Sequence, residues 1–118
     1  MANDTDPVIA LDNLLRDPAN WVGREVRVRG TLRASSTETN LVSPAGAISI
    51  ELGTGNLVPI LIRGGVAPYV GGPFLYDHDV VVSAVCCRHE EGGLSLRQIR
   101  QVTVNPGNAA LERVLEFS

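Results

Sequence analysis

The segment from residue 23 to residue 33, GREVRVRGTLR, alternates apolar and polar side chains with a period of two, and most of the polar ones are arginines. Successive side chains of a β-strand point to opposite faces, so one face of this segment is apolar and the other is cationic. A half-buried strand of this kind is typical of an antiparallel sheet or a small barrel. Val26, Val28 and Leu32 are therefore predicted to enter the core, and Gly30 is predicted to mark a bulge or bend.

Further strands are predicted along the chain. They are expected at residues 25–34, 47–52, 57–63, 77–88 and 94–105, and a short arm at 41–43 precedes the second strand. Pro59 lies inside the third of these strands and is tolerated there only at an edge or a bulge. The fifth strand loses its period of two between Leu96 and Ile99, which predicts irregularity at that point. Residues 64–76, with two Gly-Gly pairs, are expected to form an irregular connection.

Two amphipathic segments frame the strands. Residues 8–16, VIALDNLLR, have apolar side chains at helical spacing before Pro18, which predicts one short helix. Residues 108–117 predict a closing helix that is capped by Asn108 and buries Leu111, Val114 and Leu115. Trp21, in the turn after the first helix, is expected to pack across an end of the sheet.

Length and composition favour one domain. The chain has 118 residues, enough for a single core, and we expect a disordered stretch at 1–7 followed by one domain at 8–118. Its ten cationic residues are all Arg, but the net charge of −3 gives no general attraction for phosphate. The sequence shows no secretory leader and no apolar run close to the roughly 18 residues of a membrane span, which predicts a cytoplasmic protein.

The order of helix, three strands, connection, two strands and helix is that of the OB-fold. The stretch LDNLLRDPANWVGREVRVRGTL resembles the helix, turn and Val-Gly-x-x-Val-x-Val-x-Gly opening of many bacterial OB-fold-like proteins, with Val22, Gly23, Val26, Val28 and Gly30 at the matching places. The resemblance implies a mostly β fold, a five-stranded OB-like Greek-key barrel with short N-terminal and C-terminal helices. Another small β-barrel or a sandwich is the alternative architecture.

The OB resemblance also implies a ligand-binding side, made by the second and third strands and by the loops after the first and fourth. These positions correspond to residues 35–40, Ser49, Glu51, Arg63 and 89–92, with further arginines nearby on the first strand. The candidate ligand- or partner-binding residues are Arg27, Arg29, Arg33, Glu38, Asn40, Arg63 and His89. Alternatively, the arginines form a solvated strand face that opposes edge-to-edge aggregation.

A reader of single-stranded nucleic acid needs cations for phosphates and exposed aromatic rings for stacking. The arginines are present, but all five aromatic residues lie outside the expected strands: Trp21, Tyr69, Phe74, Tyr76 and Phe117. Glu90 and Glu91 in the loop after the fourth strand would repel phosphate. These features disfavour nucleic acid as the partner.

Catalytic and metal-binding patterns are lacking. The sequence contains no G-x-S-x-G, P-loop or H-E-x-x-H pattern. Asp77, His78 and Asp79 could hold a metal or tune an imidazole, but on a strand the two carboxylates share one face and His78 has the other. The adjacent Cys86 and Cys87 also point to opposite faces, so we expect one buried thiol, one partly exposed thiol and no disulfide between them. No cofactor is predicted.

The sequence therefore favours a non-enzymatic binding module that recognises a protein partner or self-associates, in an adaptor, inhibitor or immunity-type role. The alternative is a module that binds a single-stranded oligonucleotide or another anionic ligand through Arg27, Arg29, Arg33 and Arg63. An enzyme centred on residues 77–79 is the least supported of the three hypotheses.

Overall fold

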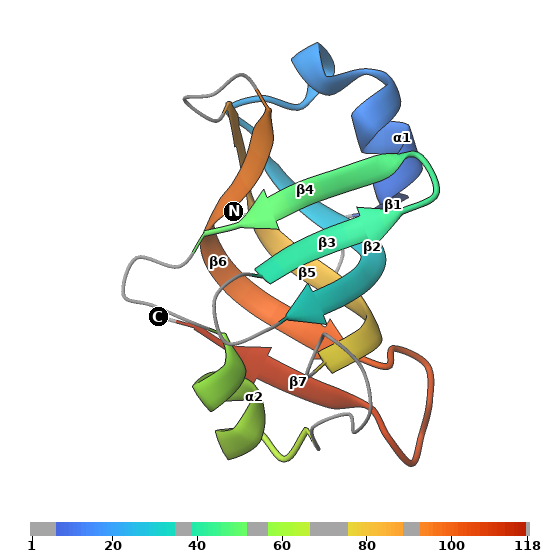
Figure 1. Ribbon diagram of the computed structural model, residues 1–118, viewed down its shortest axis with the longest axis vertical. Coiled ribbons are helices and arrows are strands. Elements are labelled where there is room, and N and C mark those ends of the chain that lie inside the picture. Colours follow the sequence, from blue (N-terminus) through green and yellow to red (C-terminus); the bar gives the residue numbers. More distant parts are fainter. Residues whose placement is uncertain (1–6, 35–38, 52–56, 67–75, 89–92, 118) are drawn as a thin grey trace.

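The computed structural model describes residues 7–34, 39–51, 57–66, 76–88 and 93–117. The elements in chain order are β1 (Val8–Ala10), α1 (Leu11–Arg16), the 3₁₀ turn η1 (Pro18–Asn20), β2 (Glu25–Ala34), β3 (Thr39–Ser43), β4 (Gly46–Ile50), α2 (Val58–Arg63), β5 (Tyr76–Arg88), β6 (Leu94–Val104) and β7 (Arg113–Glu116). The strands curl around a common axis, with α1 near one end and α2 near the other (Figure 1).

Five of the strands close into a barrel in the order β2-β3-β4-β6-β5, and β5 returns to β2. All neighbours are antiparallel except β4 and β6, which are parallel. The prediction of a mostly β fold with a closed five-stranded barrel is thus confirmed, and the barrel is compatible with an OB-like arrangement. β1 and β7 are added outside this closed circuit, on β2 and β6 respectively.

The strand that opens the barrel, β2, has the bounds and faces predicted from its alternation. Val26, Val28 and Leu32 are buried, while Arg29 and Arg33 are exposed. β2 pairs with β5 along its whole length without a register shift, so of the two alternatives predicted at Gly30, a bulge or a bend, the bulge is wrong. Instead, Gly30 lies where β2 changes its other neighbour from β1 to β3.

The predicted irregularity in the last barrel strand is confirmed. Ser83 on β5 pairs with Gln101 on β6, whereas Val85 pairs with Arg97, so β6 carries two more residues than β5 over this interval. Gln98 has a φ of 52°, in the left-handed region that side chains other than glycine rarely adopt. This bulge explains why the alternation of apolar and polar residues is lost in the sequence here.

The strand predicted at residues 57–63 is wrong, because this segment forms helix α2. Pro59 lies in the first turn of the helix, where its missing N–H costs nothing. Leu57, Val58 and Leu61 are buried, and Ile62 on the other side is exposed, which is the one-sided burial of a surface helix. The barrel keeps five strands because the predicted arm at 41–43 is part of a full strand, β3.

The predictions of the two terminal helices are wrong in part. Residues 8–10 form β1, in which Ile9 pairs in parallel with Val28, and only residues 11–16 are helical. No closing helix forms over 108–117: Asn108 does cap a turn, since its Oδ1 accepts hydrogen bonds from the backbone N–H of Ala110 and Leu111, but β7 follows.

The burial expected of the closing helix is likewise only partly observed. Leu111 and Val114 are exposed, and of the three apolar side chains only Leu115 is buried. The pairing of β7 with β6 explains the difference between Val114 and Leu115, because a half-covered strand sends alternate side chains to solvent, whereas Leu111 lies in the turn before β7.

One core fills the barrel and extends beneath both helices. It includes Leu11 and Leu14 of α1, Leu61 of α2 and the fully buried Tyr76, whose hydroxyl donates to the carbonyl of Val66. Trp21 is partly buried and packs against this core, and the guanidinium of Arg24 lies 5.2 Å from its ring centroid. In the described part of the chain, no helix is both long and apolar enough to span a membrane.

Several expectations fall outside the described residues. These are the disorder of residues 1–6, the turn at 89–92 and most of the connection over 64–76.

Candidate functional site: a groove between the added strands

β1 and β7 widen one wall of the barrel into a row of five strands, β1-β2-β5-β6-β7. The pairing registers align outward-facing residues across this wall. One cross-strand row consists of Val8, Arg27, Ser83, Gln101 and Glu116. The next row consists of Ala10, Arg29, Val81, Thr103 and Val114. Side chains of β1 and β2 therefore lie in the same two rows as those of the C-terminal strand, β7.

A groove with a volume of about 490 Å³ lies over these two rows. The lining comes from the two rows and from the segment before β7. It consists of Val8, Arg27, Arg29, Val81, Gln101, Thr103, Val114 and Glu116 from the rows, and of Pro106 and Glu112 from the segment. The size of the groove is within the range of small-ligand and peptide sites. The groove is thus a surface feature that exists only because β1 and β7 flank the barrel wall.

Apolar side chains are exposed at the two sides of the groove. Val8 on β1 is 44% exposed and Val114 on β7 is 51% exposed, while Val81 in the floor is buried. Leu111, 57% exposed, lies in the turn that leads to β7. Exposed apolar side chains thus flank the groove on both of its sides.

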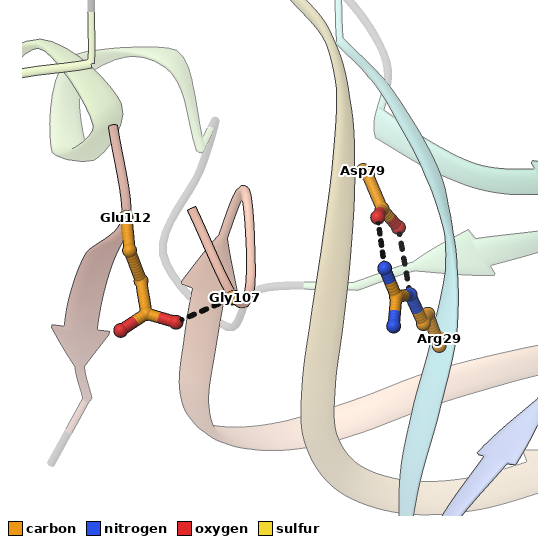
Figure 2. Close-up of polar contacts among 4 residues, drawn as sticks. All are labelled: Arg29, Asp79, Gly107 and Glu112. Atoms are coloured by element: carbon orange, nitrogen blue, oxygen red, sulfur yellow. Dashed lines mark hydrogen bonds and ion pairs between the residues drawn. The ribbon is translucent and has the colours of Figure 1, made fainter. Parts of the chain in front are cut away.

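The cationic side of the groove is formed by Arg27 and Arg29 of β2. Arg29 makes a two-point ion pair with Asp79 of β5, with Nε 3.2 Å from Oδ1 and Nη2 2.5 Å from Oδ2 (Figure 2). Hydrogen bonding to Asp79, assisted by the charge of this carboxylate, raises the pKa of Arg29 still further. The guanidinium is therefore held in place and remains charged.

The anionic side is formed by Glu112 and Glu116. The Oε2 atom of Glu112 accepts a hydrogen bond of 2.9 Å from the backbone N–H of Gly107, on the opposite side of β5 and β6 from Arg29 (Figure 2). Glu116 Oε1 accepts a hydrogen bond of 3.3 Å from the Nε2 of Gln101. The groove thus has arginines along β2, one of which is paired with Asp79, and carboxylates along β7.

The remaining predicted site residues lie elsewhere. Arg33 and Asn40 are cross-strand neighbours at the other end of β2, and Arg63 is exposed in the last turn of α2. Glu38 and His89 lie outside the described residues. Within the described ranges, only Arg27 and Arg29 of the predicted set come together in the groove.

The acidic residues at the start of the fourth predicted strand are partners of the arginines. Asp77 lies opposite Arg33 in register, with Oδ2 3.6 Å from Nε, and Asp79 holds Arg29. Their carboxylates point outward, whereas His78 lies 5.9 Å from the Tyr76 ring, centroid to centroid. The prediction that the carboxylates and the imidazole diverge is confirmed, and in the described ranges no three His, Cys, Asp or Glu residues form a metal-binding group.

The sequence does not reveal the groove residues beyond β2. Gln101 and Thr103 follow the bulge in β6, where the period of two is lost, and the acidic side belongs to the segment for which the sequence predicts a helix. No local pattern marks these residues as neighbours of Arg27. One signal in the sequence is usable. Arg29 and Arg33 lie on one strand and Asp77 and Asp79 on another that is expected to run antiparallel to it, and this arrangement indicates ion pairing between the two strands.

The two cysteines occupy different environments. Cys86 is buried, Cys87 is partly exposed, and both are free thiols, as predicted. Burial, with a smaller effect of Cys87, raises the pKa of the Cys86 thiol. Since the thiolate is the reactive form, Cys86 is expected to be inert in the folded protein.

A chromogenic disulfide reagent is therefore expected to modify one thiol of the native protein and both thiols after unfolding. Cys87→Ser should remove the native reaction, and the matched variant Cys86→Ser should retain it. Rapid modification of the Cys87→Ser variant under native conditions would contradict the burial of Cys86.

Comparisons of the chain with protein-family models, with curated proteins and with solved structures found no match.

Proposed function

We propose that this chain is a non-enzymatic, OB-like binding module that recognises a protein surface through the groove between β1 and β7. The observation that supports this proposal is the lining of the groove, in which exposed Val8 and Val114 lie beside charges of both signs. Protein interfaces combine apolar contact surface with polar and charged side chains. Adaptor, inhibitor and immunity-type proteins are the functional classes to which such a module would belong.

The OB-like assignment is supported by the strand order. The circuit β2-β3-β4-β6-β5, with parallel β4 and β6, and the helix α2 between the third and fourth barrel strands agree with a five-stranded Greek-key barrel. An OB-like barrel is used by many unrelated binding proteins, so the fold is compatible with the proposal without specifying the ligand.

The charged residues in and near the groove favour a protein over an oligonucleotide as the partner. Arg29 and Arg33 are each paired with an aspartate, and Glu112 and Glu116 share the groove with Arg27. A polyanion in the groove would meet these carboxylates directly. The described residues that line the groove also include no aromatic ring on which a base could stack.

Site-specific photocrosslinking in cells tests the proposal. A photoreactive amino acid at position 114, in the groove, is expected to form a protein crosslink that Arg27→Glu suppresses. The same amino acid at position 62 on α2, where Ile62 is similarly exposed at 57%, should not form this crosslink. Equal crosslinking at the two positions would contradict a partner that selects the groove.

A fluorescent single-stranded oligonucleotide provides the opposing test. The protein is expected to bind it no more tightly than roughly 10⁻⁴ M at physiological salt, the weak end of non-specific association. Tight binding that falls steeply with salt and is lost in Arg27→Glu would overturn the proposal in favour of nucleic acid.

A further inference from the structure

We infer that the partner in the groove is a second copy of this chain, bound face to face about a twofold axis that runs along the strands between β5 and β6. This inference rests on the proposed function and names the protein that the groove recognises.

Arg27 and Glu116 lie in one cross-strand row, on either side of Ser83 and Gln101. Three strand spacings, roughly 14 Å, separate their backbones. Rotation by 180° about an axis between β5 and β6 exchanges these two positions. Arg27 of each copy then faces the partner's Glu116, and two equivalent ion pairs form at once.

The same rotation brings the exposed valines to the contact in different ways. Val114 on β7 comes to lie opposite Arg29 of the partner copy, because both belong to the next cross-strand row, and Val8 on β1 comes to lie just outside the partner copy's β7 edge. Both valines are exposed in the single chain. The same contact would therefore cover apolar surface that otherwise faces water.

The segment before β7 supplies a projection that can enter a concave surface. Residues 105–112 form turns that extend beyond the barrel strands (Figure 1), and they carry the exposed Leu111. This segment also forms one wall of the groove through Pro106 and Glu112. In a twofold arrangement, the wall of each copy can be inserted into the groove of the other.

The hydrogen bonds that Glu112 and Glu116 already accept are compatible with this contact. Glu112 uses Oε2 to accept from Gly107, and Glu116 uses Oε1 to accept from Gln101. Each carboxylate has a second oxygen with which it can accept from an arginine of the partner. A groove of one sign would repel its own copy, whereas opposite signs on opposite sides attract it.

A charge exchange between two variants tests the inference, with association measured by sedimentation over a wide range of protein concentration. The native chain is expected to dimerise, and Arg27→Glu and Glu116→Arg are each expected to weaken dimerisation at least about tenfold, because both symmetric pairs become repulsive. An equimolar mixture of the two variants should restore a dimer. In this mixture Glu at position 27 faces Arg at position 116, and Arg27 of the other chain faces the first chain's Glu116.

Arg63→Glu is the matched control, since it reverses one exposed arginine on α2, away from the groove, and it should leave dimerisation unchanged. Thermal unfolding of each variant alone should show that it remains folded. Native mass spectrometry of the mixture should identify the restored species as the heterodimer.

A native chain that stays monomeric throughout overturns the inference, while groove-specific crosslinking to a different protein would leave the proposed function standing. The inference is also overturned if the native chain dimerises and neither Arg27→Glu nor Glu116→Arg weakens dimerisation. It is overturned equally if the mixture of the two variants does not restore a dimer. Loss of the proposed function is a separate result, recognised by tight oligonucleotide binding that depends on Arg27.

Discussion

Leu32→Ala is expected to lower the free energy of unfolding by about 2–5 kcal/mol, the range for truncation of a fully buried leucine. Leu32 has no exposed surface and lies on β2 between Leu41 of β3 and His78 of β5. Both neighbouring strands are fixed by backbone pairing, so the barrel cannot collapse into the space that is vacated. Urea unfolding followed by circular dichroism should show a lower midpoint with little change in the slope.

Ile62→Ala is the control for this prediction. Ile62 is also a large aliphatic residue, but it is 57% exposed on α2, and its truncation is expected to change the free energy of unfolding by no more than about 0.5 kcal/mol. Equal losses for Leu32→Ala and Ile62→Ala would contradict the closed barrel, since they would place both side chains in similar surroundings.

Gly30→Ala is expected to lower the free energy of unfolding by about 1–3 kcal/mol through overpacking. A Cβ at this position would lie 2.9 Å from Cγ of Leu41 and 3.2 Å from the carbonyl oxygen of Val42. Leu41 is fully buried, and the carbonyl belongs to a strand paired with β2, so neither can move away cheaply. The measurement is again the urea midpoint.

Gly93→Ala is the matched glycine substitution. Its Cβ would meet no atom within 4 Å, and the backbone there is not left-handed, so the variant is expected to be neutral or more stable by about 0.4–1 kcal/mol. The double variant Gly30→Ala, Leu41→Ala should lose less free energy of unfolding than the two single variants lose in sum. The reason is that Leu41→Ala removes the Cγ atom that the new Cβ at position 30 would meet. Strict additivity would argue against this contact.

The sequence predicts the long strands of the fold best. β2 and β5 follow from alternation and from β-branched composition, because each is half-buried or wholly buried along most of its length and its pattern reflects that burial directly. The bulge of β6 is also visible as a loss of period. These features depend on the segment itself and on one adjacent core.

The short elements α2 and β7 depend on contacts with other parts of the fold, which the local sequence pattern does not indicate. LVPILIR is apolar at its first six positions and contains three β-branched residues, as a strand would, and so short an apolar run cannot be distinguished from a buried helix by periodicity alone. Pro59, which would be a defect in a strand, is instead a helix-start signal. ALERVLEF has good helix formers, but residues 113–116 pair with the open side of β6, and this pairing overrides propensity.

The candidate groove illustrates the same limit. Arg27 and Arg29 can be identified because they share a strand whose alternation is clear, whereas Glu112, Val114 and Glu116 become their counterparts only through β7. The anionic side depends on the pairing of the C-terminal segment with β6, which no pattern within that segment specifies. A site assembled by edge strands is therefore less visible in the sequence than one carried by a single motif.

The seam between β2 and β5 has a consequence for the order in which the chain folds. Every pair along it, from Ala34–Tyr76 to Glu25–Val85, joins residues at least 42 positions apart. The chain loses loop-closure entropy before such long-range contacts stabilise it. Folding is therefore expected to take milliseconds to seconds rather than microseconds. During synthesis, the apolar face of Val26, Val28 and Leu32 lacks the strand that closes it into a core until the β5 partners of these residues, at positions 78–84, have been made.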